Sequence, residues 1–142
     1  MNSGKVAEWQ SGKVIKTFRD LLVWQRGMEL TREVYIATRA MPKAEMFALT
    51  SQMRRAASSI PMNIAEGFGQ HTRPKFVNGL RIAVGSLNEL MTAYELAVSM
   101  NPMPPSPRIP ELLAEEDRLL GSLIAKLEAK TKAEQRTSRR TR

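Results

Sequence analysis

The chain of 142 residues contains no cysteine and a single histidine, His71. Without cysteine it can form no disulfide, no thiolate metal site and no thiol nucleophile. His71 falls in a predicted turn, Gln70-His71-Thr72, with no carboxylate fixed beside it in the sequence, so we interpret it as a surface turn residue. Neither glycine-rich phosphate-binding pattern, GxxxxGKS/T or GxGxxG, occurs. The sequence therefore predicts a protein that is not an enzyme and that holds no metal or cofactor.

Long hydrophobic runs are also absent, and the longest aliphatic and aromatic cluster is Leu21-Leu22-Val23-Trp24. No segment reaches the length of a membrane-spanning helix, and the N-terminal residues lack the apolar stretch of a signal peptide. Aromatic residues make up only 6% of the chain and mostly fall on expected core positions, so no base-stacking platform is predicted. We expect a cytoplasmic protein without a membrane partner.

Helical periodicity, not strand-like alternation, organises the apolar residues. Helices are predicted over about residues 20–40, 42–69, 72–97 and 110–130, joined at residues 101–107 by an extended proline-rich connection. The expected fold is an all-α, up-and-down four-helix bundle at residues 18–130, preceded by a flexible lead-in at 1–17 and followed by a basic disordered tail at 131–142. The third helix carries a bundle seam of Phe76, Leu80, Ala83, Leu87, Leu90, Tyr94 and Ala97.

Pro61 lies inside the second predicted helix, where it removes the backbone hydrogen bond to the carbonyl of Ala57 and usually causes a kink. The helix either bends and continues, with a hydroxyl such as that of Ser58 meeting the freed carbonyl, or breaks in two. We favour the bend because the apolar positions keep their phase across the proline. Gly85, on the flank of the third helix, predicts the close approach of another backbone.

The second helix carries a polar lane directly beside its apolar one. At about 100° per residue, these polar residues fall within roughly 80° of arc, whereas an ordinary surface helix spreads its charges over the whole solvent side. We interpret the lane as a buried or half-buried network at a helix or subunit contact, with Arg55 matched by Glu66 or Glu89. A recognition surface is the less favoured alternative, and a carboxylate metal site is less favoured still. The lane comprises Glu45, Gln52, Arg55, Ser59, Asn63 and Glu66, with Glu89 from the third helix.

A buried charge left without its partner costs several kcal/mol. The sequence therefore predicts that Arg55→Ala and Glu66→Ala each destabilise the fold or its assembly. The alternative metal site would use the carboxylates of Glu45, Glu66 and Glu89.

The net charge of +8 is unevenly distributed. Residues 126–142 hold seven basic and two acidic residues, a net charge of +5, which leaves +3 for the other 125 residues. Such a segment attracts polyanions without sequence preference; a merely solubilising tail is an alternative of equal weight. The predicted nucleic-acid contacts are Arg54, then Arg73, Lys75 and Arg81 at the start of the third helix, and Arg136, Arg139, Arg140 and Arg142 in the tail.

Several ordered motifs carry a resemblance to a known family. They are FRDLLVWQ at residues 18–25, LTSQMRRA at 49–56, SIPMNIAEGFG at 59–69 and AVGSLNEL at 83–90. Over about residues 18–127 the chain resembles the four-helix bundle family encoded in ribosomal-RNA intervening sequences. Where that family has a basic residue after Glu-Gly-Phe-Gly, this chain has Gln70, which weakens any basic patch at this turn.

The resemblance implies a compact up-and-down bundle that assembles as a homopentamer. A distant relative of the family, the accessory protein of diversity-generating retroelements, partners a reverse transcriptase and binds nucleic acid. We therefore expect a non-catalytic homo-oligomeric module that binds RNA, DNA or a ribonucleoprotein. The alternative is a protein–protein scaffold or an accessory subunit, for example of a reverse transcriptase, that does not itself recognise nucleic acid.

Overall fold

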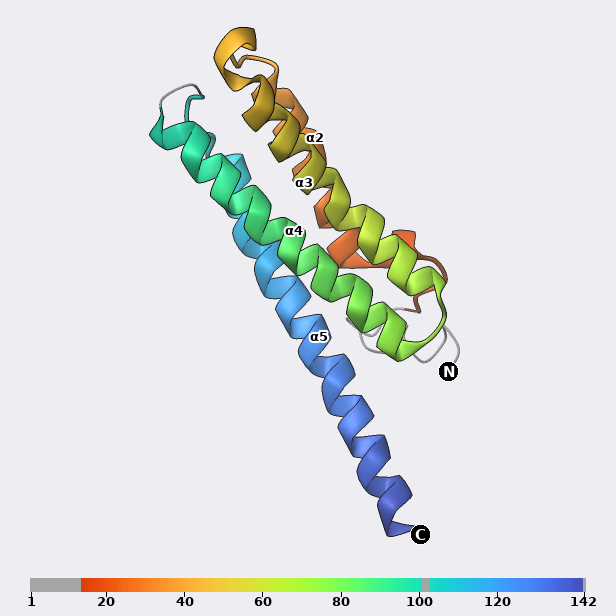
Figure 1. Ribbon diagram of the computed structural model, residues 1–142. Helices are drawn as coiled ribbons and strands as arrows, with labels where there is room; N and C mark the ends of the chain where they lie inside the picture. Colours follow the sequence, from red (N-terminus) through yellow and green to blue (C-terminus); the bar gives the residue numbers. More distant parts are fainter. Residues whose placement is uncertain (1–13, 101–102, 142) are drawn as a thin grey trace.

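The computed structural model describes residues 14–100 and 103–141, and the side chains of residues 44–47 lie outside that description. Successive helices of the described chain run in opposite directions and pack side by side, and the first long helix also contacts the last (Figure 1). This arrangement confirms the predicted all-α, up-and-down four-helix bundle. The elements are a short 3-10 helix, η1 (Phe18–Asp20), and the helices α2 (Leu22–Thr38), α3 (Lys43–Gly69), α4 (Arg73–Ser99) and α5 (Arg108–Arg140).

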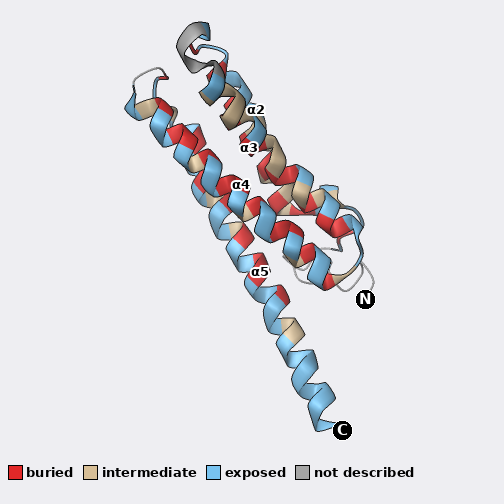
Figure 2. Cartoon of the chain, viewed as in Figure 1, coloured by how far each residue is buried: buried red, intermediate tan, exposed pale blue. Residues whose placement is uncertain are grey.

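The core lies between the four helices, along the predicted seam of α4. Every seam residue from Phe76 to Ala97 is buried, and Figure 2 shows buried residues gathered where the helices face one another. Burying one leucine or isoleucine side chain contributes roughly 2 kcal/mol, so the shared interior holds the helices together more than helix propensity does. None of the described helices is both long and apolar enough to cross a membrane.

The start of α4 follows the predicted capping pattern. Thr72 is the N-cap, its hydroxyl accepts the backbone N–H of Lys75 at 3.4 Å, and Pro74 lies in the first turn. Proline is tolerated there because the first helical N–H groups have no partner within the helix.

α3 continues as one helix through Pro61, as we favoured. The Ala57 carbonyl, which the proline leaves without a backbone N–H, accepts a hydrogen bond from the Thr31 hydroxyl of α2 at 3.0 Å. Ser58, the hydroxyl expected to do this, donates to the carbonyl of Arg55 at 3.3 Å instead. That detail of the prediction is wrong because the partner comes from a neighbouring helix, which local sequence does not reveal.

The close backbone approach lies at a different glycine from the expected one. Nothing in the described chain lies within 4 Å of a Cβ built on Gly85, so the prediction is wrong within the single chain. α3 and α4 instead meet at Gly67 and Gly79. A Cβ on Gly79 would lie 2.6 Å from the carbonyl oxygen of Asn63 and 2.9 Å from the Cα of Gly67. Glycine is required at this crossing because any side chain would meet backbone atoms.

The connection between α4 and α5 is fastened to the end of α4. Met103 is buried, and the backbone N–H of Ser106 donates to the Tyr94 hydroxyl at 2.9 Å. Asn101 and Pro102 of the predicted extended segment lie outside the described residues.

α5 is longer than the sequence predicted. We expected this helix to end near Lys130 and a disordered tail to follow, whereas the helix continues to Arg140. Figure 1 shows its C-terminal part running past the other helices. The added residues include alanine, lysine, glutamate, glutamine and arginine, which are strong helix formers, and Glu134 forms an ion pair with Arg73 of α4. The basic residues of this segment are therefore displayed on a helix.

Candidate functional site

The polar lane of α3 faces α4 along part of its length. The Gln52 amide donates to the Glu89 carboxylate, and the hydroxyls of Ser59 and Ser86 lie 2.8 Å apart, within hydrogen-bonding distance. Asn63 donates to the carbonyl and hydroxyl oxygens of Ser59 at 2.8 and 2.9 Å. These contacts tie α3 to α4 and fix the side chains in the middle of the lane.

The charged members of the lane lie elsewhere. Arg55 and Glu66 are exposed, and among the described residues no ion pair joins Arg55 to Glu66 or to Glu89. The expected match is therefore absent among the described residues, and the Glu89 carboxylate accepts a hydrogen bond from Gln52. The side chain of Glu45 lies outside the described residues. The described part of the chain therefore does not bury Arg55 or Glu66.

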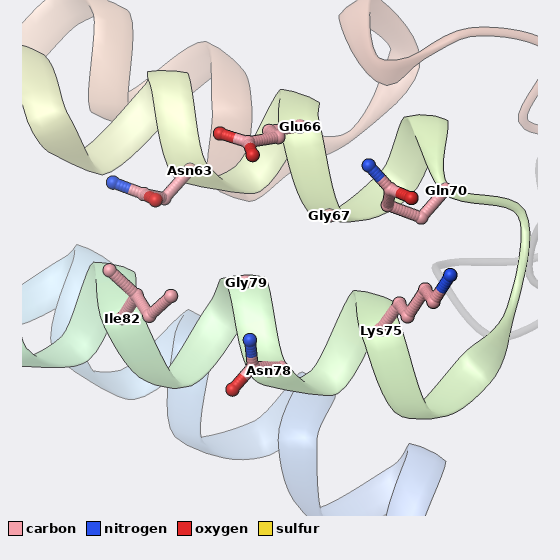
Figure 3. Close-up of a pocket in the computed structure, with 8 residues that line it drawn as sticks. All are labelled: Asn63, Glu66, Gly67, Gln70, Lys75, Asn78, Gly79 and Ile82. Atoms are coloured by element: carbon pink, nitrogen blue, oxygen red, sulfur yellow. The ribbon is translucent and has the colours of Figure 1, made fainter.

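A groove of about 260 Å³ opens over the crossing of Gly67 and Gly79 (Figure 3). Figure 3 shows the two glycines facing one another, with the groove's other residues on the adjoining turns of α3 and α4. Amide, carboxylate and ammonium groups lie together here, which suits a polar partner surface better than an apolar ligand. The polar lining residues are Asn63, Glu66, Gln70, Lys75 and Asn78.

His71 lies in the turn between α3 and α4, next in the chain to Gln70. It is exposed, and its φ of 62° places it in the left-handed region. Within the described part of the chain, no three histidine, aspartate or glutamate side chains come together in a way that could hold a metal ion.

Arg54, a predicted nucleic-acid contact, is held against α2. Its Nε donates to the Thr38 hydroxyl at 2.8 Å, and its guanidinium lies 4.7 Å from the centroid of the Tyr35 ring. Both contacts fix the side chain within the chain itself, so part of its donor capacity is already used.

Arg73 is buried, with 6% of its surface exposed, in contrast to the exposed basic surface that the sequence predicted. Its Nη1 and Nη2 donate to the two carboxylate oxygens of Glu134 at 2.8 and 2.9 Å. Arg81, a turn or two further along, donates to Glu128 at 2.5 Å. Two of the three predicted basic residues at the start of α4 thus bind α5. The two partners could not be assigned from sequence because they lie more than 40 residues away.

Of the remaining predicted basic contacts, those within the described residues are exposed. Lys75 lies at the groove, and Arg136, Arg139 and Arg140 lie at the end of α5. Lys132, which the sequence analysis did not single out, is exposed on the same helix. Arg142 lies outside the described residues. The exposed basic residues at the end of α5 are Lys132, Arg136, Arg139 and Arg140.

Sequence reasoning missed Glu116, a carboxyl group in the core. Its residue is 0% exposed, and its two carboxyl oxygens have no hydrogen-bond partner among the described residues. Burial raises the pKa of Glu116 to about 9, and the charge of Glu115 acts in the same direction. Arg26 opposes this shift but is itself bound to Glu115 at 2.6 Å. The group is therefore uncharged in the folded protein at neutral pH.

Gly27 of α2 makes room for this carboxyl group. A Cβ on Gly27 would lie 2.9 Å from Oε2 of Glu116. The sequence held one signal: Leu113 and Leu120 lie on one apolar face of the last helix, and position 116 lies between them on the same face.

These features define an all-α bundle with a polar interface between two helices, a groove over it and a basic helical end. The family model of the 23S rRNA-intervening sequence protein matches residues 19–122, which is most of the chain, and the chain belongs to that family. No curated protein sequence matches it. The basic end of α5 lies beyond the matched residues.

Proposed function

We propose that this protein is a non-catalytic homo-oligomeric module, a pentamer of the chain, that binds RNA or a ribonucleoprotein in the cytoplasm. The observation that carries the proposal is the gathering of exposed basic side chains at the end of α5 in a chain of net charge +8. Lysine and arginine bind phosphates and release counterions, which drives association with any nucleic acid. Membership of a family named for ribosomal-RNA intervening sequences supports RNA as the ligand.

Apolar side chains exposed on α3, on α4 and at the C-cap of α4 support the oligomer. Met62 and Met100 are 67% and 63% exposed, and Ile82 and Leu96 are both 47% exposed. Ile82 also lines the groove over the glycine crossing. Large exposed apolar side chains beside half-buried polar groups are typical of protein–protein contacts. A second copy of the chain would cover them.

The second candidate function is a protein–protein scaffold or an accessory subunit, for example of a reverse transcriptase, without direct nucleic-acid recognition. The observation that favours it is the groove between α3 and α4, whose amide and charged lining could receive a polar protein surface. A stoichiometric protein partner that is recovered after nuclease treatment would favour this function over RNA binding.

The full-length protein should bind a generic fluorescein-labelled RNA, with a dissociation constant that rises steeply with salt. Fluorescence anisotropy across a salt series measures this directly. The whole chain is needed because a chain ending at Lys130 would remove Glu134 and leave the buried Arg73 without that ion pair. Failure to bind RNA or DNA at low salt would remove the nucleic-acid part of the proposal.

Arg55→Ala tests the oligomer. Within the single chain Arg55 is exposed, so its loss should change the stability of the monomeric fold by less than about 0.5 kcal/mol. In a pentamer whose contact buries the lane, the same change should cost a few kcal/mol and lower the mass in solution. Light scattering and thermal unfolding measure both effects, with Arg32→Ala, an exposed arginine on α2, as the matched control. A wild-type mass of one chain would exclude the pentamer.

A further inference from the structure

The end of α5 carries its cations on one side of the helix. At about 100° per residue, Lys132, Arg136, Arg139 and Arg140 fall within roughly 100° of arc, and they cover about 12 Å along the axis. This face lies roughly opposite the buried side that Leu120 and Leu127 define. All four are exposed, and Figure 2 shows the whole end of α5 exposed. We call these four residues the basic stripe.

The acidic residues of the same segment are turned toward α4. Glu134 binds Arg73 through both carboxylate oxygens, and Glu128 binds Arg81. Among the described residues, no ion pair joins any member of the basic stripe to a carboxylate. The two arginines of α4 therefore neutralise the acids of this segment, and the positive charge of the stripe faces solvent.

The Arg73–Glu134 pair also fixes where the stripe is displayed. The Arg73 side chain is 7% exposed, and its two bonds to Glu134 have the planar, bidentate geometry of a strong ion pair. Thr131, one turn earlier, accepts a third bond from Nη1 at 3.3 Å. The segment that precedes Arg136 is thus anchored to the bundle, and the cations are displayed along the helix that continues from it.

We propose that the basic stripe binds the phosphate backbone of duplex RNA without reading its sequence. This inference deepens the proposed function and rests on it, since it names the form of nucleic acid and the residues that contact it. Arg73, which the sequence suggested as a contact, is buried in its ion pair with Glu134 and positions α5, whereas Arg81 is exposed and bound to Glu128.

Two properties of the stripe favour a duplex over a single strand. Proteins that bind single strands gain much of their affinity by stacking bases on aromatic side chains, and α5 contains no aromatic residue. A duplex concentrates phosphates along a stiff axis, and its binding is more salt-dependent for each contact than that of a single strand. Arginine and lysine can read guanine edges, but the major groove of duplex RNA is too deep and narrow for side chains to reach them. A short face of four cations therefore matches the phosphate backbone of a duplex.

The test compares a labelled RNA duplex of about 20 base pairs with either of its single strands, by fluorescence anisotropy of the full-length protein across a salt series. Four phosphate contacts per chain predict a slope of about −3 to −4 in log K against log salt, which is roughly a 100-fold loss of affinity between 50 and 200 mM salt. The single strand should bind at least several-fold more weakly.

Lys132→Gln, Arg136→Gln and Arg139→Gln should each make the slope of log K against log salt for the duplex shallower by about one, because each removes one phosphate contact. Glutamine keeps the helix propensity, and circular dichroism checks the fold. Arg32→Gln on α2 removes the same charge from a different helix and should leave the slope unchanged. The variant that carries all three substitutions should bind the RNA duplex at least 10-fold more weakly than the wild type.

The possible failures are distinguishable. If the wild type binds RNA and the triple variant binds it equally well, the stripe is not the site, while the proposed function stands through another surface. If the single strand binds as tightly as the duplex, the choice of a duplex is wrong. If the wild type binds no RNA, the proposed function fails and this inference fails with it.

Discussion

Replacing Glu116 with glutamine should remove most of the pH dependence of the free energy of unfolding between about pH 5 and pH 9. In the folded protein the pKa of Glu116 is raised from 4.5 to about 9, chiefly by burial. Below the lower value the carboxyl group is protonated in both states. Above it, the unfolded chain releases the proton while the folded chain keeps it, so rising pH favours the unfolded state. The loss ends once the folded group also ionises.

The expected effect is large for a single side chain. Each pH unit in this window lowers the stability of the wild type by about 1.4 kcal/mol, so on the order of 3 kcal/mol is lost between the unfolded-state pKa and about pH 7. Glutamine carries no charge at any pH in the window. Glu116→Gln should therefore give a nearly flat curve and be more stable than the wild type above neutral pH.

Urea unfolding at a series of pH values measures this, with Asp117→Asn as the control. Asp117 is the next residue of α5 and is exposed, so its replacement should leave the wild-type slope in place. Asp20 affects stability at lower pH. Backbone N–H groups of Thr17 and Lys16 lower the pKa of Asp20, so the stability that its charged form contributes is lost as pH falls below its unfolded-state pKa of 3.8. A Glu116→Gln variant that kept the wild-type slope would show that this carboxyl group is hydrated or paired in solution.

The fold could be predicted because its signals are local. The spacing of the α4 seam, the Thr72 cap and the unbroken apolar phase across Pro61 are all properties of short segments, and each is found in the structure as predicted. Local periodicity assigns each helix an apolar face, and four such faces can be buried together in a bundle.

The candidate site could be predicted only in part, because its contacts join distant segments. The Ala57 carbonyl accepts a hydrogen bond from the Thr31 hydroxyl of α2, and the buried Arg73 forms an ion pair with Glu134 of α5. Neither partner follows from the residues beside it. Arg55, by contrast, is exposed in the single chain. Whether the polar lane lies at a subunit contact is therefore tested by measuring the oligomeric state.

The wrong glycine prediction has a different cause, because the seam of α4 already held the information. At about 100° per residue, Gly79 lies at the edge of the seam, whereas Gly85 lies nearly opposite it. The seam therefore favours Gly79 for a contact inside the bundle, and the prediction for Gly85 left this angle out. Gly79 meets backbone atoms of α3, whereas Gly85 meets nothing within the described chain.

Gly79→Ala should destabilise the bundle even though alanine is the better helix former. The change gains about 1 kcal/mol of helix propensity. The new Cβ would lie 2.6 Å from the Asn63 carbonyl oxygen and 2.9 Å from the Cα of Gly67, and both are backbone atoms of α3. A helix backbone cannot yield at one residue, so the two helices must move apart. Such overpacking costs about 3 kcal/mol or more here, and we expect a net loss on the order of 2–3 kcal/mol.

Gly121→Ala is the matched control, because a Cβ on Gly121 of α5 meets nothing within 4 Å. The same chemical change should there raise stability by about 0.5–1 kcal/mol. Opposite signs in urea unfolding would show that the backbone approach between α3 and α4 decides the outcome, since helix propensity favours alanine at both positions. If Gly79→Ala stabilised the protein as Gly121→Ala does, α3 and α4 would not be in close contact in solution. The groove over Gly67 and Gly79 would then have a different shape, and its candidacy as a partner surface would fail with it.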